Sequence, residues 1–303
     1  MKRTDVEREA ASVPGAAPGD QASPADDARA SLAKWPRRAE GMLEVPFDRL
    51  GALPGALDLI RDRVIDGVVV PDFYSAAEAE AVTARFWAEA DDIPNNAPFG
   101  KPPQVFCRPL TTTEDADEYL RMAPVARAFV DRIFAGLAPF EPRLEAALGA
   151  LARRPVRIPK AVDGRDYCPA TLRTLPTGHG FAPHFGNAFL FAETCAHLRS
   201  LMRCEMHLSY FTPLALPPSG GELVLYPIEW ADAEDGKVDG VPVEFAPLFS
   251  EGRTISLKPG DLIVFDGSRI LHAITPVAPG PVRVTLGGFL GFTADDTGIV
   301  YWS

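Results

Sequence analysis

The chain has 303 residues, which is enough for one large domain or two small ones with an apolar core. Its 30 Lys and Arg against 41 Asp and Glu give a net charge of −11, which disfavours a nucleic-acid partner, because phosphate backbones bind basic surfaces. No apolar run reaches the roughly 20 residues of a membrane span, and the charged amino terminus does not lead into a signal-peptide core. These features predict a cytoplasmic protein that binds neither nucleic acid nor membrane.

The first part of the chain changes character near residue 40. Residues 1–40 are rich in Ala, Pro, Asp and Arg and show neither helical nor strand periodicity, which predicts a disordered tail. Residues 41–303 are expected to form a single catalytic domain. Its opening segment, 41–154, is interpreted as a helical cap and lid region, and 155–303 as the core.

Within the cap region the patterns predict a short helix, a strand and a second helix. They cover residues 54–64, 65–73 and 75–90, and Ser75 is the expected N-cap of the second helix. The segment from Asp91 to Asp117 is studded with Pro and turn residues and is too long for a simple connector, which favours a lid or binding loop.

Helical spacing of apolar residues continues from Met122 to Arg154, with a break expected near Pro139. After Pro155 the chain becomes a series of short apolar runs bounded by Gly and Pro, with one short helix around residues 197–203 and an acidic loop at 231–252. About eight strands without intervening helices are typical of a jelly roll. The predicted fold is mainly β with flanking helices (α+β), around a double-stranded β-helix, or cupin-like, core.

Two histidines in this second half stand in apolar runs: His184 in FAPHFGNAFLF and His272 in DLIVFDGSRILH. A lone His in an apolar strand is more often a hydrogen-bonded core residue, but the strand context of His272 favours a metal site. A non-haem Fe(II) triad has two His and a carboxylate, which usually lies two residues after the first His. That position is Gly186, which cannot ligate. Either there is no metal, or the iron has a coordination position left for another ligand.

Arg283 follows His272 on the next predicted strand, where a buried cation would bind the distal carboxylate of an iron-bound 2-oxo acid. Thr285 lies on the same strand face and adds a hydroxyl. Ser209, on a predicted central strand, needs a hydrogen-bond partner, either at the metal site or within the packed core. Rival metal ligands are also considered, with less support from their context: His179, His207, Glu205, Glu222 and Asp261.

The second half of the chain resembles the free-standing Fe(II)/2-oxoglutarate halogenases that chlorinate hapalindole- and welwitindolinone-type indole alkaloids. The resemblance covers about Tyr167 to Ser303 almost continuously. The matching stretches are Tyr167 with PATLR, HFGN followed by FL, LSYFTPL, GGELVLY with EW, PGDLIVF, RVTLGGFLGF and the final YWS. The specific part is the combination of His-x-Gly at residues 184–186 with the distal His272 and Arg283; GGEL or PGDL alone is common among oxygenases.

The resemblance implies that His184 and His272 ligate Fe(II), that Gly186 leaves room for chloride, and that Arg283 holds 2-oxoglutarate. Arg173 and Thr285 are expected to help bind the cosubstrate, and Ser209 to act beside the iron. The implied reaction consumes O2, releases succinate and CO2, and chlorinates an unactivated aliphatic C–H bond.

For the substrate, the expected contacts are Phe181 and two residues of the lid-like segment, Pro103 and Phe106. Aromatic and proline side chains suit an apolar, free-standing natural product better than a carrier-tethered acyl group, so no carrier protein is expected. Two alternatives stay open: a hydroxylase or desaturase with water in the vacant coordination position, and an inactive cupin-like binding protein. The second is disfavoured because Arg283 and both histidines are retained.

Overall fold

The computed structural model describes residues 32–53, 55–93, 95–96, 103–107, 109–231 and 250–303, and residues 35–303 form one compact unit. The larger sheet of this unit contains β1 (Arg37–Ala39), β2 (Met42–Glu44), β3 (Gly67–Val70), β4 (Asn95–Asn96), β5 (Gln104–Phe106), β6 (Val156–Arg157), β7 (Thr171–Leu175), β9 (Met202–Ala215), β12 (Leu262–Phe265), β14 (Arg283–Thr293) and β15 (Ile299–Trp302). The smaller sheet contains β8 (Phe181–His184), β10 (Leu223–Glu229), β11 (Arg253–Ile255) and β13 (Ile270–Ile274).

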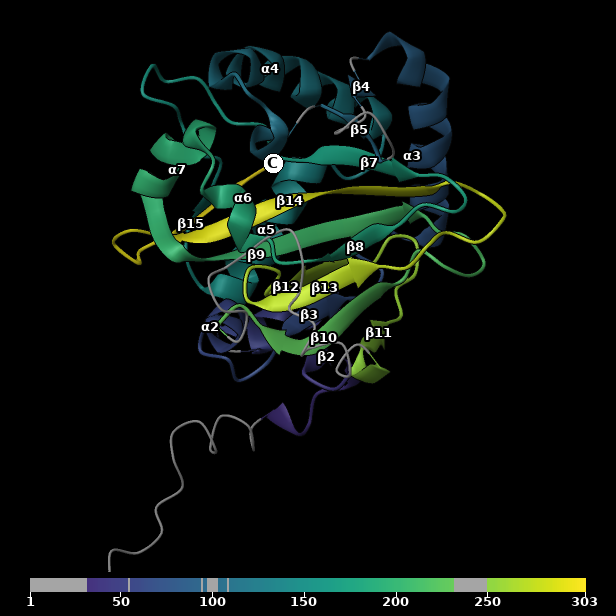
Figure 1. Ribbon diagram of the computed structural model, residues 1–303, viewed down its shortest axis with the longest axis vertical. Helices are drawn as coiled ribbons and strands as arrows, with labels where there is room; N and C mark the ends of the chain where they lie inside the picture. Colours follow the sequence, from purple (N-terminus) through teal and green to yellow (C-terminus); the bar gives the residue numbers. More distant parts are fainter. Residues whose placement is uncertain (1–31, 54, 94, 97–102, 108, 232–249) are drawn as a thin grey trace, which may run out of the picture. The chain divides into compact units, whose positions relative to one another are not determined.

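The helices lie mostly before β7. They are α2 (Ala56–Arg61), α3 (Ala76–Glu89), α4 (Ala116–Ile133), α5 (Phe140–Ala152), α6 (Asn187–Leu190) and α7 (Ala196–Leu201), with 3-10 turns η1 (Phe47–Ala52), η2 (Ala90–Asp92), η4 (Leu110–Thr112) and η5 (Glu193–Cys195). Figure 1 shows α3 and α4 at the top of the view, beside β4, β5 and β7. None of the helices in the described residues combines the length and apolarity that crossing a bilayer requires.

The eight strands from β7 to β14 form the predicted jelly roll. Except from β10 to β11, successive strands alternate between the sheets. As a result β12, β9, β14 and β7 are neighbours in the larger sheet, and β11, β10, β13 and β8 make up the smaller one. All pairs among these eight strands are antiparallel. The prediction of a mainly β fold with a double-stranded β-helix core is therefore confirmed.

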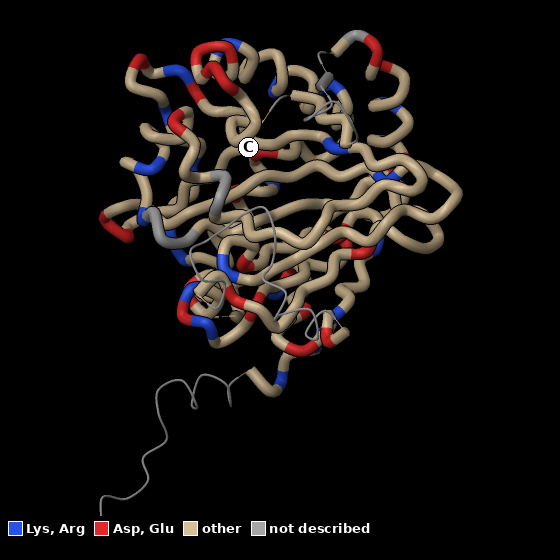
Figure 2. The backbone as a smooth tube through the Cα atoms, viewed as in Figure 1, with Lys and Arg blue, Asp and Glu red and all other residues tan. Residues whose placement is uncertain are grey.

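The buried core lies between the two sheets. Apolar side chains from both sheets meet there, together with Val277 from the loop after β13: Met42, Val69, Leu175, Leu223, Leu225, Ile255, Ile263, Phe265, Ile270 and Ile274. Charged residues lie mainly on the outer helices and loops, whereas the strands that cross the middle of the molecule are largely uncharged (Figure 2). Such a core keeps the sheets in register, because side chains on successive strand positions alternate between the core and the outer face.

The amino-terminal region adds to the larger sheet. The predicted helix at 54–64 is α2, the strand at 65–73 is β3, and β3 pairs with β12 of the jelly roll. The helical stretch from 122 begins earlier than predicted, as α4, and α5 follows the expected break. Residues 1–31 of the expected tail and 232–249 of the expected acidic loop lie outside the described residues, while Arg37–Ala39 form β1.

Ser75 caps α3 as predicted. Its hydroxyl accepts a hydrogen bond from the Glu78 amide at 3.2 Å, and the Glu78 carboxylate accepts one from the Ser75 amide at 2.8 Å, which completes a capping box. We expect Ser75→Ala to lower the free energy of unfolding by about 1 kcal/mol, because α3 then loses a partner for one amide of its first turn. Urea unfolding of the two proteins measures this difference, and an unchanged midpoint would contradict it.

Candidate active site

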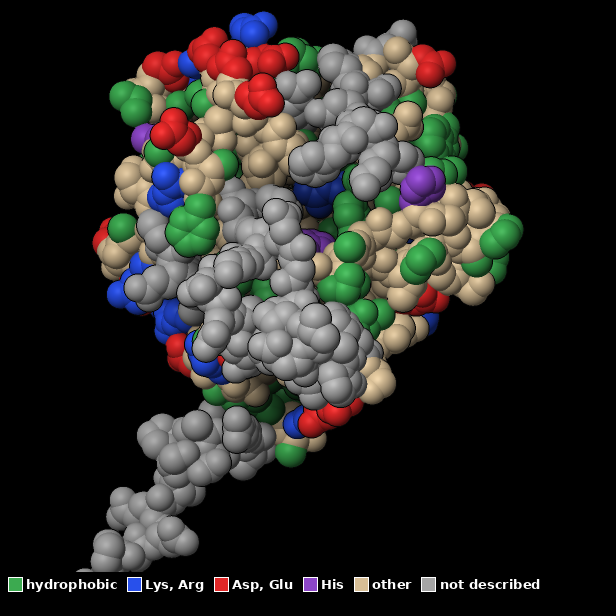
Figure 3. All heavy atoms as spheres, viewed as in Figure 1, with side chains coloured by type: hydrophobic (Ala, Val, Ile, Leu, Met, Phe, Trp, Pro, Cys, Tyr) green, Lys and Arg blue, Asp and Glu red, His purple; other side chains and the backbone are tan. Residues whose placement is uncertain are grey.

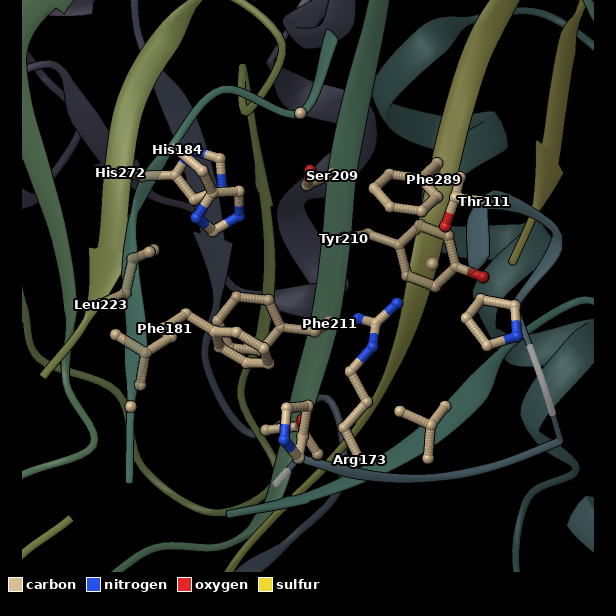
Figure 4. Close-up of a pocket in the computed structure, with 18 of the residues that line it drawn as sticks. Thr111, Arg173, Phe181, His184, Ser209, Tyr210, Phe211, Leu223, His272 and Phe289 are labelled. Carbon is tan, nitrogen blue, oxygen red and sulfur yellow. The ribbon is translucent and has the colours of Figure 1, made fainter. Parts of the chain in front are cut away.

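The smaller sheet brings the two predicted metal ligands together. His184 is the last residue of β8 and His272 the middle residue of β13, and the antiparallel register pairs them directly. Their ring centroids are 4.3 Å apart. Figure 4 shows both imidazoles side by side at one wall of the pocket. The two residues, far apart in the sequence, are thus neighbours because β8 and β13 are paired strands.

Hydrogen bonds fix which nitrogen of each ring carries the proton. The Nδ1 atom of His184 lies 2.8 Å from the Ala182 carbonyl oxygen, and Nδ1 of His272 lies 2.9 Å from the Ile270 carbonyl oxygen. A carbonyl oxygen only accepts, so each Nδ1 carries the hydrogen and each Nε2 has the lone pair that a metal needs. Burial lowers the pKa of both histidines, and for His272 the neighbouring His184 adds to the effect. Both rings are therefore neutral, as metal ligands must be.

Gly186 lies against a tight turn that joins β12 to β13. Its amide donates a hydrogen bond to the Gly267 carbonyl oxygen at 2.7 Å. A Cβ at position 186 would lie 3.0 Å from that oxygen and 3.1 Å from Nε2 of His207, which is tight but open to small adjustment. In the part of the chain that the structure describes, no three His, Cys, Asp or Glu side chains are grouped closely enough to hold a metal ion.

The rival ligands have other environments. Glu222 is bonded to the Thr275 hydroxyl and the Gly220 amide, and Asp261 accepts hydrogen bonds from the amides of Asp72 and Lys258. The side chain of Glu205 lies outside the described residues. His207 is buried on β9, close to the pair without joining it.

His207 is an unusual buried polar residue. Its side chain is 1% exposed, its ring packs against those of Phe289 and Trp302 at centroid distances of 5.3 and 6.4 Å, and its Nδ1 has no hydrogen-bond partner among the described residues. Burial lowers the pKa of His207 to about 3. The imidazole is consequently neutral over the whole range in which the protein would be handled.

This neutral histidine makes the stability depend on pH. Below the unfolded-state pKa of about 6.5 the unfolded chain binds a proton that folded His207 does not take up until about pH 3. The free energy of unfolding is therefore expected to fall as the pH drops below 6.5, by up to about 1.4 kcal/mol per pH unit from this residue. Urea unfolding of metal-free wild type and His207→Gln from pH 7.5 to 4.5 measures it. Parallel pH profiles for the two proteins would contradict the assignment.

Two arginines enter the same space from the larger sheet. Arg283 begins β14 and is 4% exposed, and Arg173 lies in the neighbouring strand β7, where its backbone pairs with Thr285. Burial lowers the pKa of each guanidinium to about 10, which leaves both charged at neutral pH. Neither forms an ion pair with the described residues, and Nε of Arg283 is buried without a partner there. A small dicarboxylate would stabilise two such desolvated cations, because its negative charges would pair with theirs.

A cavity of about 470 Å³ connects the histidines and the arginines, with Gly186 and Ser209 on its wall. Figure 3 shows a hollow in this face with a basic and a histidine side chain in its depth. The remaining lining is largely apolar and includes the aromatic rings of Phe181, Phe211 and Phe289. The two predicted metal ligands thus come from the smaller sheet, and the cationic end of the pocket comes from the larger one.

The predicted substrate contacts divide into two groups. Phe181 and Pro103 line the cavity, and the Phe181 ring centroid lies 6.2 Å from that of His184. Phe106 instead is 2% exposed and packs edge-on against Phe86 in the core, at 4.9 Å between centroids. Val105 takes its place in the pocket, because side chains alternate along β5. Phe106 therefore faces the core, and the prediction that it contacts the substrate was wrong.

Several lining residues were not predicted from the sequence. Phe211 shares a strand face with Ser209, so the period-2 pattern of β9 was a signal for it. Phe289 lies opposite Ser209 in the β14–β9 register, which only the structure reveals. Thr111 and Leu223 come from η4 and β10, and their sequence context carries no comparable signal.

The sequence model of the family described as carrier-protein-independent halogenase WelO5 matches residues 39–303. The L-gamma-glutamyl-L-propargylglycine hydroxylase of Streptantibioticus cattleyicolor is 29% identical over 194 residues, which is 62% of this chain and 68% of the relative.

Solved structures with partial likeness include an N-substituted L-amino acid dioxygenase from Burkholderia ambifaria AMMD, with a TM-score of 0.47, 18% identity, and coverage of 84% of this chain and 91% of that one. Another is the non-heme alpha ketoglutarate dependent epimerase SnoN from nogalamycin biosynthesis, with a TM-score of 0.49, 16% identity and 85% coverage of both chains.

Proposed function

The chain belongs to the WelO5 family of carrier-protein-independent halogenases, and so to the Fe(II)/2-oxoglutarate oxygenase class, and we propose that it chlorinates an aliphatic C–H bond of a small molecule. The substrate would be a free-standing, mainly apolar compound, and residues 41–303 would act as a single catalytic domain. The observation that carries this proposal is Gly186, which stands where a ligating carboxylate is expected, beside two histidines whose Nε2 atoms have the lone pair for a metal.

The side chains present fit the implied groups. His184 and His272 would hold Fe(II) through Nε2, and the position beside Gly186 would take chloride. Fe(II) with 2-oxoglutarate and O2 supplies the oxidation of an unactivated C–H bond, with succinate and CO2 as coproducts and chloride as the transferred group. The larger sheet would supply the cosubstrate site, in which Arg283 and Arg173 neutralise a carboxylate and Thr285 adds a hydroxyl.

The other residues that line the cavity would exclude water, contact the substrate or orient a bound group. Phe181, Phe211 and Phe289 would exclude water from the reacting centre and give the substrate an apolar surface. Ser209 presents its hydroxyl between the Gly267 turn and the pocket, since a Cβ at position 267 would lie 2.5 Å from Ser209 Oγ and 3.3 Å from Cε1 of His272. It would orient a polar group bound at the iron position. Pro103 and Phe181 would contact the substrate.

Hydroxylation on the same scaffold is the second candidate. It is favoured by the Streptantibioticus cattleyicolor relative, which is a hydroxylase. In that case water, and not chloride, would take the position beside Gly186, while the histidines and arginines would keep the same roles.

A spectroscopic experiment without substrate separates the two. Fe(II) and 2-oxoglutarate are added anaerobically to the purified protein, and the visible metal-to-ligand charge-transfer band is recorded with and without chloride. We expect a band that shifts when chloride is added, because a halide bound to the iron changes its ligand field. A band indifferent to chloride would favour the hydroxylase, and no band at all would contradict the cofactor assignment.

A further inference from the structure

The space beside Gly186 is bounded by a backbone carbonyl and by an imidazole. The position of a Cβ on residue 186 would be 3.0 Å from the Gly267 carbonyl oxygen and 3.1 Å from Nε2 of His207. Gly267 also lies against the Ser209 hydroxyl. Nε2 of His207 therefore lies beside the point at which a side chain on residue 186 would begin.

An anion bound beside Gly186 would lie close to a backbone oxygen, which carries a partial negative charge. The Gly267 carbonyl oxygen repels negative charge, and the Gly186 amide already donates to that oxygen at 2.7 Å. A buried anion is costly unless donors replace its water. Of the three atoms nearest to a Cβ at position 186, only Nε2 of His207 can carry a hydrogen.

The surroundings of His207 also select its tautomer. Its Nδ1 is buried without a partner among the described residues, against the rings of Phe289 and Trp302. An unpaired N–H at Nδ1 would leave a donor unsatisfied and would turn the Nε2 lone pair toward the anion. A hydrogen on Nε2 avoids both, since it aims a donor at the vacant place. This tautomer is the opposite of the one that His184 and His272 adopt.

We propose that His207 binds the halide by donating a hydrogen bond from Nε2 at the position that Gly186 leaves open. This inference rests on the proposed function and assigns His207 a binding role in place of metal ligation. The ring belongs to β9 of the larger sheet, whereas both proposed ligands belong to the smaller one.

Three substitutions at one position test the donor itself. His207→Leu removes it, His207→Gln puts an amide N–H near the place of Nε2, and His207→Asn puts one near the place of Nδ1. Each protein is loaded anaerobically with Fe(II) and 2-oxoglutarate, and the chloride dissociation constant is taken from the shift of the charge-transfer band. His197→Gln is the matched control, because His197 pairs with the Tyr167 hydroxyl at 2.9 Å and is not among the nearest neighbours of a Cβ at position 186.

We expect His207→Leu and His207→Asn to weaken chloride binding about tenfold or more, and His207→Gln to stay within about threefold of wild type, as for one hydrogen bond to a charged group. The band without chloride should be unchanged in all of them. If the Leu protein does not fold, the Gln and Asn proteins decide, because they differ only in where the donor lies.

The results distinguish a failure of the role of His207 from a failure of the proposed halogenase function. Equal chloride affinity in wild type and all folded His207 variants would overturn the role of His207 and leave the halide site intact. Equal weakening in the Gln and Asn variants would also overturn it, since donor position would then not matter. A wild-type band that ignores chloride would overturn the proposed halogenase, and the inference with it.

Discussion

Replacing Gly186 by Asp is expected to abolish chlorination while the protein still binds iron. The carboxylate would take the coordination position that chloride needs and would complete the two-His, one-carboxylate set that Fe(II) favours. The pocket admits the new side chain only tightly, because its Cβ would lie 3.0 Å from the Gly267 carbonyl oxygen and 3.1 Å from Nε2 of His207. Chlorinated product should fall by at least about a hundredfold, and the charge-transfer band should no longer respond to chloride.

Gly186→Ala is the matched control for this prediction. It adds the same Cβ without a carboxylate, so any loss that it shares with the Asp variant is due to crowding alone. Iron content and the chloride response of the band are measured for both proteins, and products by mass spectrometry once a substrate is known. Chlorinated product from the Asp variant at the wild-type level would mean that chloride binds elsewhere.

Replacing Arg283 by Leu is expected to remove 2-oxoglutarate binding. Leaving one partner of a buried charge pair unmatched costs about 3–5 kcal/mol, which corresponds to roughly 150- to 5,000-fold in affinity. Leu suits the position, since the guanidinium now lies 5.5 Å from the Phe211 ring centroid and is 4% exposed. The measurement is an anaerobic titration of the Fe(II)-loaded protein with 2-oxoglutarate, followed at the charge-transfer band.

Arg283→Lys distinguishes charge from geometry in that titration. A lysine keeps the positive charge but makes a single-point contact in place of the two-pronged one, so we expect an intermediate affinity. Because Arg283 is a desolvated cation without an ion pair among the described residues, the metal-free Leu variant should be at least as stable as wild type. Wild-type 2-oxoglutarate affinity in the Leu variant would exclude Arg283 as the cosubstrate anchor.

Much of the fold was predictable because its strands are short apolar runs between Gly and Pro. The pairing of those strands was less accessible. Nothing in the sequence indicates that β3 pairs with β12, because an isolated strand pattern carries no information about its partner. The start of α4 was also misplaced: the helix begins at Ala116, after the N-cap Asp115, and its first residues had been assigned to the lid-like segment that ends at Asp117.

The candidate site also has some features that the sequence predicts and others that it does not. Residue type and order pointed to His184, Gly186 and His272 as a group, but the tautomers depend on hydrogen bonds to carbonyl oxygens that the sequence does not specify. His207 was considered solely as a rival ligand, because its approach to position 186 arises from the turn at Gly267 and the placement of β9. Phe106 was assigned to the pocket because three strand residues in a Pro-rich segment do not define which face is inward.

The division of the site between the sheets has a thermodynamic consequence. His184 and His272 belong to the smaller sheet, whereas Arg173 and Arg283 belong to the larger one. A cosubstrate held at both ends would join the two layers as a removable cross-link. Metal and cosubstrate would then strengthen each other's binding by the same factor, since coupling between two ligands is reciprocal. Opening the sandwich would break both attachments together, so the melting temperature of the doubly loaded protein would report that coupling directly.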